Sequence, residues 1–158
     1  MKNFVRTLAF VSAAAFATPV FALTAQQTVQ KEVVVKNADG SEQVRYEDAS
    51  LVTPGERIVY TLNFNNDQVE PASNLVLTMP IPGEITYLEG TAENDQSVVT
   101  YSADGGQTFT TRDSVMVADG FGSQRAASTE ELTHIRWNIA GPIAPGESGA
   151  LVYKGLLK

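Results

Sequence analysis

Residues 56–65 read Glu-Arg-Ile-Val-Tyr-Thr-Leu-Asn-Phe-Asn, and this stretch decides the fold class. Its apolar side chains recur at every second position, at Ile58, Tyr60, Leu62 and Phe64. Successive side chains of a β-strand point to opposite faces of a sheet, so a period of two predicts a strand with one buried face. We therefore expect residues 56–65 to form a strand whose apolar face contacts a hydrophobic core.

The same alternation continues along most of the chain after residue 27. Two further rows are predicted to face the core: Leu75, Leu77 and Met79, then Ile135, Trp137 and Ile139. Weaker patterns predict strands over residues 29–36, 43–50, 85–89, 98–101, 109–111, 114–117 and 150–157. Residues 23–28 are interpreted as a polar leader, and residues 118–129, rich in Gly, Ser and Ala, as an exposed loop.

Turn signals separate these strands. The tripeptide Pro-Gly-Glu occurs at residues 54–56, 82–84 and 145–147, each time before a predicted strand. Pro followed by Gly suits the central pair of a type II turn, because glycine tolerates the positive φ that the second position requires. With 158 residues, of which 43% are hydrophobic, the chain is long enough for one antiparallel sandwich with a real core.

Residues 1–22 differ in kind from the rest. Two basic residues precede an apolar run over residues 7–17, and a proline follows it. This is the layout of a secretory signal peptide, and Val20 and Ala22 supply the small residues expected before a cleavage point. The run has roughly half of the length that a membrane span needs. We expect cleavage after Ala22, with Ala17 as the alternative, no integral membrane segment afterwards, and export to the periplasm, cell surface or medium.

Charge and cysteine content exclude several classes of protein. The predicted signal peptide holds two of the 11 basic side chains and none of the 18 acidic ones, so cleavage changes the formal charge from −7 to −9. Such a surface repels nucleic acid and anionic lipid, so the expected partner is a protein or a second copy of the chain. The absence of cysteine excludes a disulfide framework, a thiolate metal site and a cysteine nucleophile.

Five pieces of the sequence form a moderately specific pattern: residues 53–66, 72–77, 80–83, 135–137 and 144–148. Together they resemble the conserved-repeat family called domain of unknown function eleven, found in exported bacterial and archaeal surface proteins. The resemblance covers about residues 33–157. It implies an immunoglobulin-like sandwich without catalytic residues. We therefore expect residues 23–158 to form a single all-β, immunoglobulin-like antiparallel sandwich of seven to nine strands.

Residues 102–109 read Ser-Ala-Asp-Gly-Gly-Gln-Thr-Phe and fit the Asp-box pattern S-x-D-x-G-x-T-[WF]. The pattern fixes five positions: Ser102, Asp104, Gly106, Thr108 and Phe109. We expect Asp104 to accept hydrogen bonds from turn amides, the glycines to permit a tight reversal, and Phe109 to pack the turn onto the core. A sialidase would need several copies and a far longer chain, so the motif predicts a structural hairpin.

Calcium is the one cofactor that the composition leaves open, because loop oxygens suit a hard cation. The candidate ligands are Glu93, Asn94, Asp95, Asp113 and Asp119. No D-x-[DN]-x-[DN]-G loop is present, and solvated loop acids are the simpler interpretation. We therefore predict no cofactor and no metal.

Nothing in the sequence indicates an enzyme. His134 is the only histidine, and one imidazole cannot build a three-histidine zinc site. Neither a G-x-S-x-G elbow nor a phosphate-binding loop nor H-E-x-x-H occurs. Adjacent acids such as Glu47 and Asp48 point to opposite faces of a strand and cannot act as a pair. A glycosidase-type pair of carboxylates from distant loops is the one catalytic alternative that the sequence leaves open.

Two functions from different classes remain. The first is an exported structural or adhesive subunit that self-assembles through edge strands, with residues 33–35 pairing with a neighbour and the leader free to reach across. The second is a soluble periplasmic or secreted binding module for a glycan, an envelope polymer or a partner protein. It would use the loop over residues 118–129, with Phe121 and Arg125 as contacts. We prefer the first.

Overall fold

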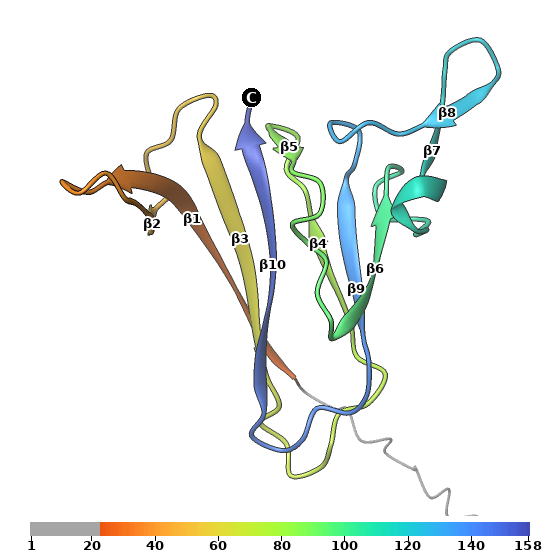
Figure 1. The fold of residues 1–158 in the computed structure, drawn as a ribbon. Helices are drawn as coiled ribbons and strands as arrows, with labels where there is room; N and C mark the ends of the chain where they lie inside the picture. The colour runs from red at the N-terminus through yellow and green to blue at the C-terminus, as the bar shows by residue number, and fades with distance from the viewer. Residues whose placement is uncertain (1–22) are drawn as a thin grey trace, which may run out of the picture.

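The computed structural model describes residues 23–158, which form ten β-strands and one short 3₁₀ helix, η1 (Figure 1). The predicted signal peptide lies outside the described residues. The strands are β1 (Thr24–Lys36), β2 (Glu42–Asp48), β3 (Arg57–Asn65), β4 (Val76–Pro80), β5 (Ile85–Tyr87), β6 (Ser97–Ser102), β7 (Met116–Ala118), β8 (Gln124–Ala126), β9 (His134–Ile139) and β10 (Ser148–Leu157), and η1 spans Arg112–Ser114. The described strands outnumber the seven to nine expected, because β7 and β8 form an additional hairpin.

The strands form two main antiparallel sheets. The first has the order β2-β1-β3-β10-β5, the second has the order β4-β9-β6, and β7 pairs only with β8. The predicted all-β antiparallel sandwich is thereby confirmed. In constant-type immunoglobulin domains, the last strand lies in the sheet that does not contain the first strand. Here the last strand, β10, lies in the same sheet as β1, between β3 and β5.

The core lies between β3, β10 and β5 on one side and β9, β6 and β4 on the other. The row predicted on β3 is buried, and so is the row predicted on β9: Ile58, Tyr60, Leu62 and Phe64, then Ile135, Trp137 and Ile139. Of the third predicted row, Met79 is buried, while Leu75 and Leu77 are partly buried against the core. Alternating polarity therefore located the interior correctly.

A run of tyrosine rings connects the two sheets. Tyr60 on β3 stacks on Tyr153 of β10, with ring centroids 4.7 Å apart and planes within 6° of parallel. Tyr87 of β5 lies 6.4 Å from Tyr153 and 5.6 Å from Tyr101, which belongs to the second sheet. Three of the hydroxyl groups are hydrogen-bonded: Tyr153 donates to the Pro80 carbonyl at 2.7 Å, and the Tyr87 and Tyr101 hydroxyls lie 3.1 Å apart. Buried polar groups without hydrogen-bond partners are costly, so these bonds offset the cost of burying the hydroxyl groups.

Two glycines in β10 make room for neighbouring side chains. A Cβ at Gly155 would lie 2.1 Å from Cγ2 of Ile85 and 3.0 Å from the Thr86 carbonyl oxygen. A Cβ at Gly149 would lie 2.3 Å from the ring of Phe64. Both positions therefore require glycine, because any side chain there would collide with these neighbours.

Two of the three Pro-Gly-Glu segments form the predicted turn. Gly55 and Gly146 have φ values of 89° and 76°, and each turn is closed by a hydrogen bond from the following glutamate amide. Gly83 has no positive φ, so the prediction of a type II turn at residues 82–84 is wrong. There the Ile85 amide donates to Pro82, which shifts the turn by one residue along the chain.

Three predicted boundaries are also wrong. Residues 24–28 are not a free leader, because β1 begins at Thr24 and pairs with β3 from there to Glu32. Residues 109–111 form no strand and make only an isolated bridge between Tyr101 and Thr110. Residues 118–129 are not one irregular loop, because β8 pairs with β7 inside them.

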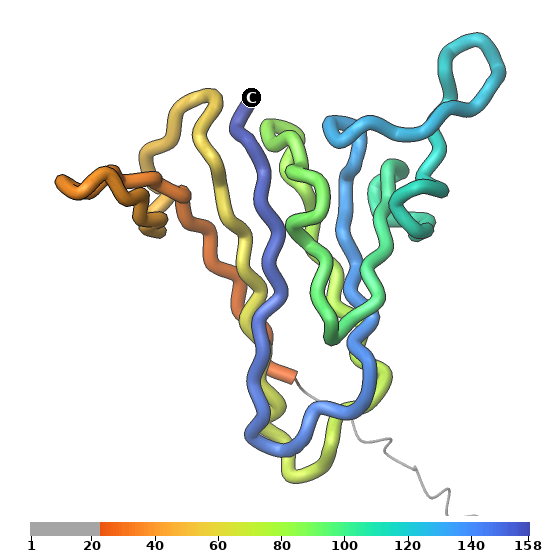
Figure 2. The backbone as a smooth tube through the Cα atoms, viewed as in Figure 1, coloured from red at the N-terminus to blue at the C-terminus, as the bar shows by residue number. Residues whose placement is uncertain are grey.

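The β1–β2 and β7–β8 hairpins project from the sandwich on opposite sides of the molecule (Figures 1 and 2). The second sheet has fewer strands than the first and packs against β3, β10 and β5. The outer half of β1 and all of β2 therefore extend beyond the core.

Gly155→Ala tests the packing between β10 and β5. We expect a loss of about 1–3 kcal/mol in the free energy of unfolding, because the added methyl group overpacks Ile85. Urea denaturation measures this. Gly83→Ala is the matched control, because a Cβ there has no atom within 4 Å, and its unfolding midpoint should change little. Equal effects of the two substitutions would contradict this account of β10.

Candidate functional site

The Asp-box residues come together in one hydrogen-bonded turn after β6. The Ser102 hydroxyl donates to Oδ1 of Asp104 at 2.6 Å, and the Gly106 amide donates to Oγ of Ser102 at 2.9 Å. The Asp104 carboxylate also accepts the Gln107 amide at 2.9 Å and the Thr108 hydroxyl at 2.6 Å. The Asp104 carboxylate thus joins the start of the turn, at Ser102, to its end, at Thr108.

These contacts change the acidity of Asp104. The hydrogen bonds from Ser102 and Thr108 hold the pKa of the Asp104 carboxyl far below its ordinary value of 3.8. A depressed pKa means that the folded state favours the charged form. The resulting stabilisation is present above pH 3.8 and is lost as the pH falls towards the folded-state pKa.

Phe109 does not pack onto the core, so that prediction is wrong. Its ring is half-buried against the outer face of β9, where the Arg136 guanidinium lies 3.5 Å from the ring centroid. The His134 ring meets it edge-on at 6.5 Å. Alternation along β9 points Ile135 inward and its neighbours outward, so the Asp-box turn folds over the outer face and Phe109 covers it.

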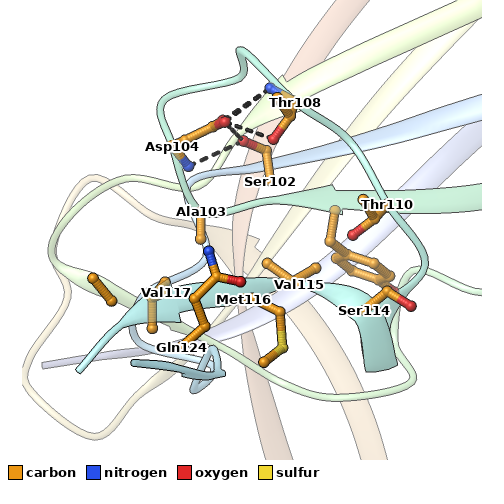
Figure 3. A pocket seen from close by; sticks show the side chains of 12 residues that line it. Ser102, Ala103, Asp104, Thr108, Thr110, Ser114, Val115, Met116, Val117 and Gln124 are labelled. Carbon is orange, nitrogen blue, oxygen red and sulfur yellow. Dashed lines mark hydrogen bonds between the residues drawn. The ribbon is translucent and has the colours of Figure 1, made fainter. Parts of the chain in front are cut away.

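A pocket of about 480 Å³ lies between the Asp-box turn and the β7–β8 hairpin (Figure 3). Hydroxyl and amide groups of Thr110, Ser114 and Gln124 line it together with the apolar Val115 and Val117. Asp104 is the one carboxylate among its lining residues, and its oxygens already accept the hydrogen bonds of the turn. The pocket thus offers polar binding groups and no carboxylate free for acid–base chemistry.

The tip of the β7–β8 hairpin holds an exposed aromatic ring in a fixed loop. Oδ1 of Asp119 accepts the amides of Phe121 at 2.8 Å and Ser123 at 3.1 Å. Gly120 and Gly122 take φ values of 82° and 94°, which the tight reversal requires. Phe121 is 95% exposed, the largest exposure of any big hydrophobic side chain in the described chain.

Arg125 is engaged within the molecule. Its guanidinium makes a two-pronged contact with the Glu131 carboxylate, with both N–O distances at 2.7 Å. Oε2 of Glu131 also accepts the Ser128 amide at 2.9 Å. Hydrogen bonds from Arg125 and Ser128 lower the pKa of Glu131 to about 2. Of the two predicted contact residues, Phe121 faces solvent and Arg125 ties the hairpin to the segment before β9.

Three of the five candidate calcium ligands, Glu93, Asn94 and Asp119, make hydrogen bonds within the protein. Glu93 accepts a hydrogen bond from the buried Tyr101 hydroxyl, and Asn94 caps the Gln96 amide at 3.0 Å. Asp119 closes the β7–β8 tip. Across residues 23–158, no three acidic or histidine side chains gather in a way that could hold a metal ion.

The projecting β1–β2 hairpin presents an open sheet edge. All seven residues of β2 are exposed. Val34, Val44 and Tyr46 lie on one face, which is the outer face of the sheet, and they are 51%, 49% and 51% exposed. Residues 33–35 were predicted as the edge, but β2 covers them and is itself the outermost strand.

An ion cluster fastens this hairpin to the sandwich. Glu32 of β1 accepts a hydrogen bond from Arg57 at 2.8 Å and another from Lys154 of β10, and its side chain is only 4% exposed. Burial alone would raise the pKa of Glu32, but the hydrogen bonds from Lys154 and Arg57 outweigh it and lower the pKa. Sequence inspection missed this cluster, because its members are far apart in the chain.

Comparisons of this chain with models of protein families, with curated proteins and with solved structures give no match. The resemblance to domain of unknown function eleven therefore stays a prediction. Over residues 23–158, none of the helical structure is long or apolar enough to cross a bilayer.

Asp104→Ala tests the Asp-box turn. We expect a lower melting temperature at pH 7 and loss of protection of the Gln107 and Thr108 amides in hydrogen exchange, because both bond to the carboxylate. Asp113→Ala, at an exposed carboxylate nearby, is the control. The difference between wild type and Asp104→Ala should shrink progressively as the pH falls below 3.8, because the unfolded state takes up the proton first and the advantage of the charged carboxylate is lost towards its lowered pKa. A difference that grows at low pH would refute the assignment.

Proposed function

We propose that this chain is a non-catalytic, exported structural protein that self-associates through the edge strand β2. Export rests on the signal-peptide pattern of residues 1–22. Self-association is supported by one observation above all, the projecting β1–β2 hairpin whose outer strand is exposed along its whole length.

An isolated two-stranded hairpin is marginally stable in water, and an open edge is a template for pairing with another strand. The β1–β2 hairpin is attached to the sandwich by the pairing of β1 with β3, which ends at Glu32, and by the ion pairs of Glu32. On the outer strand, Val44 and Tyr46 are 49% and 51% exposed. Pairing with another strand would satisfy the open backbone groups and cover these side chains. Association is therefore the function that this geometry supports best.

The direction of the backbone groups on β2 follows from the hairpin register. The Asn37 amide donates to the Ser41 carbonyl at 2.8 Å, so Asn37 and Ser41 are a hydrogen-bonded pair. Antiparallel pairs alternate between hydrogen-bonded and non-hydrogen-bonded. Along the β1–β2 register, the residues whose N–H and C=O groups face away from β1 are therefore Glu42, Val44, Tyr46 and Asp48.

Val44→Pro tests association through this edge. Proline removes an outward N–H that β1 does not use, so the monomer should keep its fold while the association constant falls at least about tenfold. Sedimentation velocity of the exported protein over a concentration series measures the association. Val44→Thr keeps the N–H and should retain most of it. If the wild-type protein remains monomeric at every concentration, the proposed function is wrong.

A second candidate is a binding module for an envelope polymer or partner protein, favoured by Phe121. Exposed aromatic residues held by a fixed backbone are frequent anchors at interfaces, because little side-chain entropy is lost on binding. The Asp119 hydrogen bonds fix the loop around Phe121 before any partner arrives.

Phe121→Ala tests this second candidate. In co-sedimentation with purified peptidoglycan, the wild-type protein should pellet with the polymer and the Phe121→Ala variant should lose most of that binding. Val69→Ala, at a side chain that is 92% exposed elsewhere, is the matched control and should bind as the wild type does. Equal pelleting of Phe121→Ala and wild type would remove the β7–β8 tip as the contact.

A further inference from the structure

We infer that two copies of this chain pair through β2 in antiparallel orientation, with Tyr46 opposite Tyr46 on the two-fold axis and Arg45 of each copy opposite Glu47 of the other. The inference rests on the proposed self-association and specifies its register. It would join the two five-stranded sheets into one continuous sheet across the molecular two-fold.

The backbone groups of β2 fit this register. In this register Tyr46 pairs with Tyr46 and Val44 pairs with Asp48, and all of these residues direct their N–H and C=O groups away from β1. The residues between them, Arg45 and Glu47, then form non-hydrogen-bonded pairs. Side chains approach most closely in such pairs.

The charges on β2 are complementary in the same register. Arg45 makes no salt bridge among the described residues, and its guanidinium reaches only the Gln43 side-chain oxygen of its own strand, at 3.5 Å. Glu47 contacts Lys31 at 3.4 Å and remains 52% exposed. A two-fold axis at Tyr46 places each Arg45, which has no ion pair within the described part of its own chain, opposite the Glu47 carboxylate of the other copy. The contact occurs twice per dimer.

Neighbouring registers lack this match. A two-fold at Arg45 sets Arg45 against itself and Glu42 against Asp48, so like charges face each other. A two-fold at Glu47 sets that carboxylate against itself. A two-fold at Val44 pairs Gln43 with Arg45 and forms no ion pair. Opposite charges on an exposed edge thus select one register, as charged groups at interfaces commonly do.

This register also brings two tyrosine rings together. Tyr46 lies on the outer face beside Val59, where the two line a small depression together with Gln30. Its ring is 51% exposed in the single chain. On the two-fold axis it would meet the same ring of the second copy, and cross-strand aromatic pairs stabilise antiparallel sheets.

Two complementary charge reversals test the register. Arg45→Glu alone and Glu47→Arg alone should each weaken homodimerisation at least about tenfold, because each sets like charges opposite one another twice. An equimolar mixture of the two variants should associate as the wild type does, since every Glu then faces an Arg. Sedimentation velocity of each sample measures this, and unchanged circular dichroism confirms that each variant is folded.

Single-cysteine variants give an independent measurement, because the chain has no cysteine of its own. Hydrogen-bonded pairs in an antiparallel ladder have Cα atoms about 5.5 Å apart, which suits a disulfide. Under mild oxidation Tyr46→Cys should form a covalent dimer, whereas Val34→Cys, equally exposed on β1, should not.

The outcomes separate the two proposals. If the wild type associates and Val44→Pro abolishes association, but the charge-reversed mixture stays monomeric and Tyr46→Cys does not crosslink, this register is wrong and self-association stands. If the wild type never associates, both are wrong.

Discussion

The fold depends on the stacking of Tyr60 on Tyr153, which ties the centre of β3 to the centre of β10. These strands share nine paired positions, and their inner faces supply much of the floor of the core. From Tyr153 the aromatic contacts continue through Tyr87 to Tyr101, and so reach the second sheet. A chain without disulfides keeps its two sheets together through this apolar filling and through hydrogen bonds such as that from Trp137 to the Ala92 carbonyl at 2.8 Å.

The five-stranded sheet is wider than the core that it covers. The second sheet covers β3, β10 and β5, and the β1–β2 hairpin extends past it. A buried carboxylate stabilises a fold only when paired, and Glu32 is paired with both Arg57 and Lys154 at the point where the hairpin leaves the sandwich. The cluster links β1, β3 and β10 across the outer face, so the base of the hairpin is fixed while its outer edge remains free.

The sequence predicted well what depends on local alternation. The rows on β3 and β9 are buried because a period of two leaves no other way to cover so many apolar side chains. Alternation does not reveal which strands lie beside each other, so the sequence could not predict the position of β10 in the sheet or the residue at which β1 begins. The short polar β8 has no apolar period at all, so alternation could not predict its pairing with β7 or the contact of Arg125 with Glu131. The Asp-box was recognisable because its hydrogen bonds are local, whereas the Glu32 cluster joins residues up to 122 positions apart.

Symmetry sets a limit on what β2 alone can build. A two-fold interface uses the same surface on both copies and is closed, so pairing of β2 edges ends at a dimer. A fibre or matrix needs a second contact elsewhere on each copy. Phe121 lies on the β7–β8 hairpin, which projects on the side opposite to the β1–β2 hairpin (Figure 1). The exposed ring of Phe121 and the open edge of β2 are therefore two separate surfaces on one chain. Edge pairing and binding through the β7–β8 tip are compatible. Together they would let dimers connect to a larger structure.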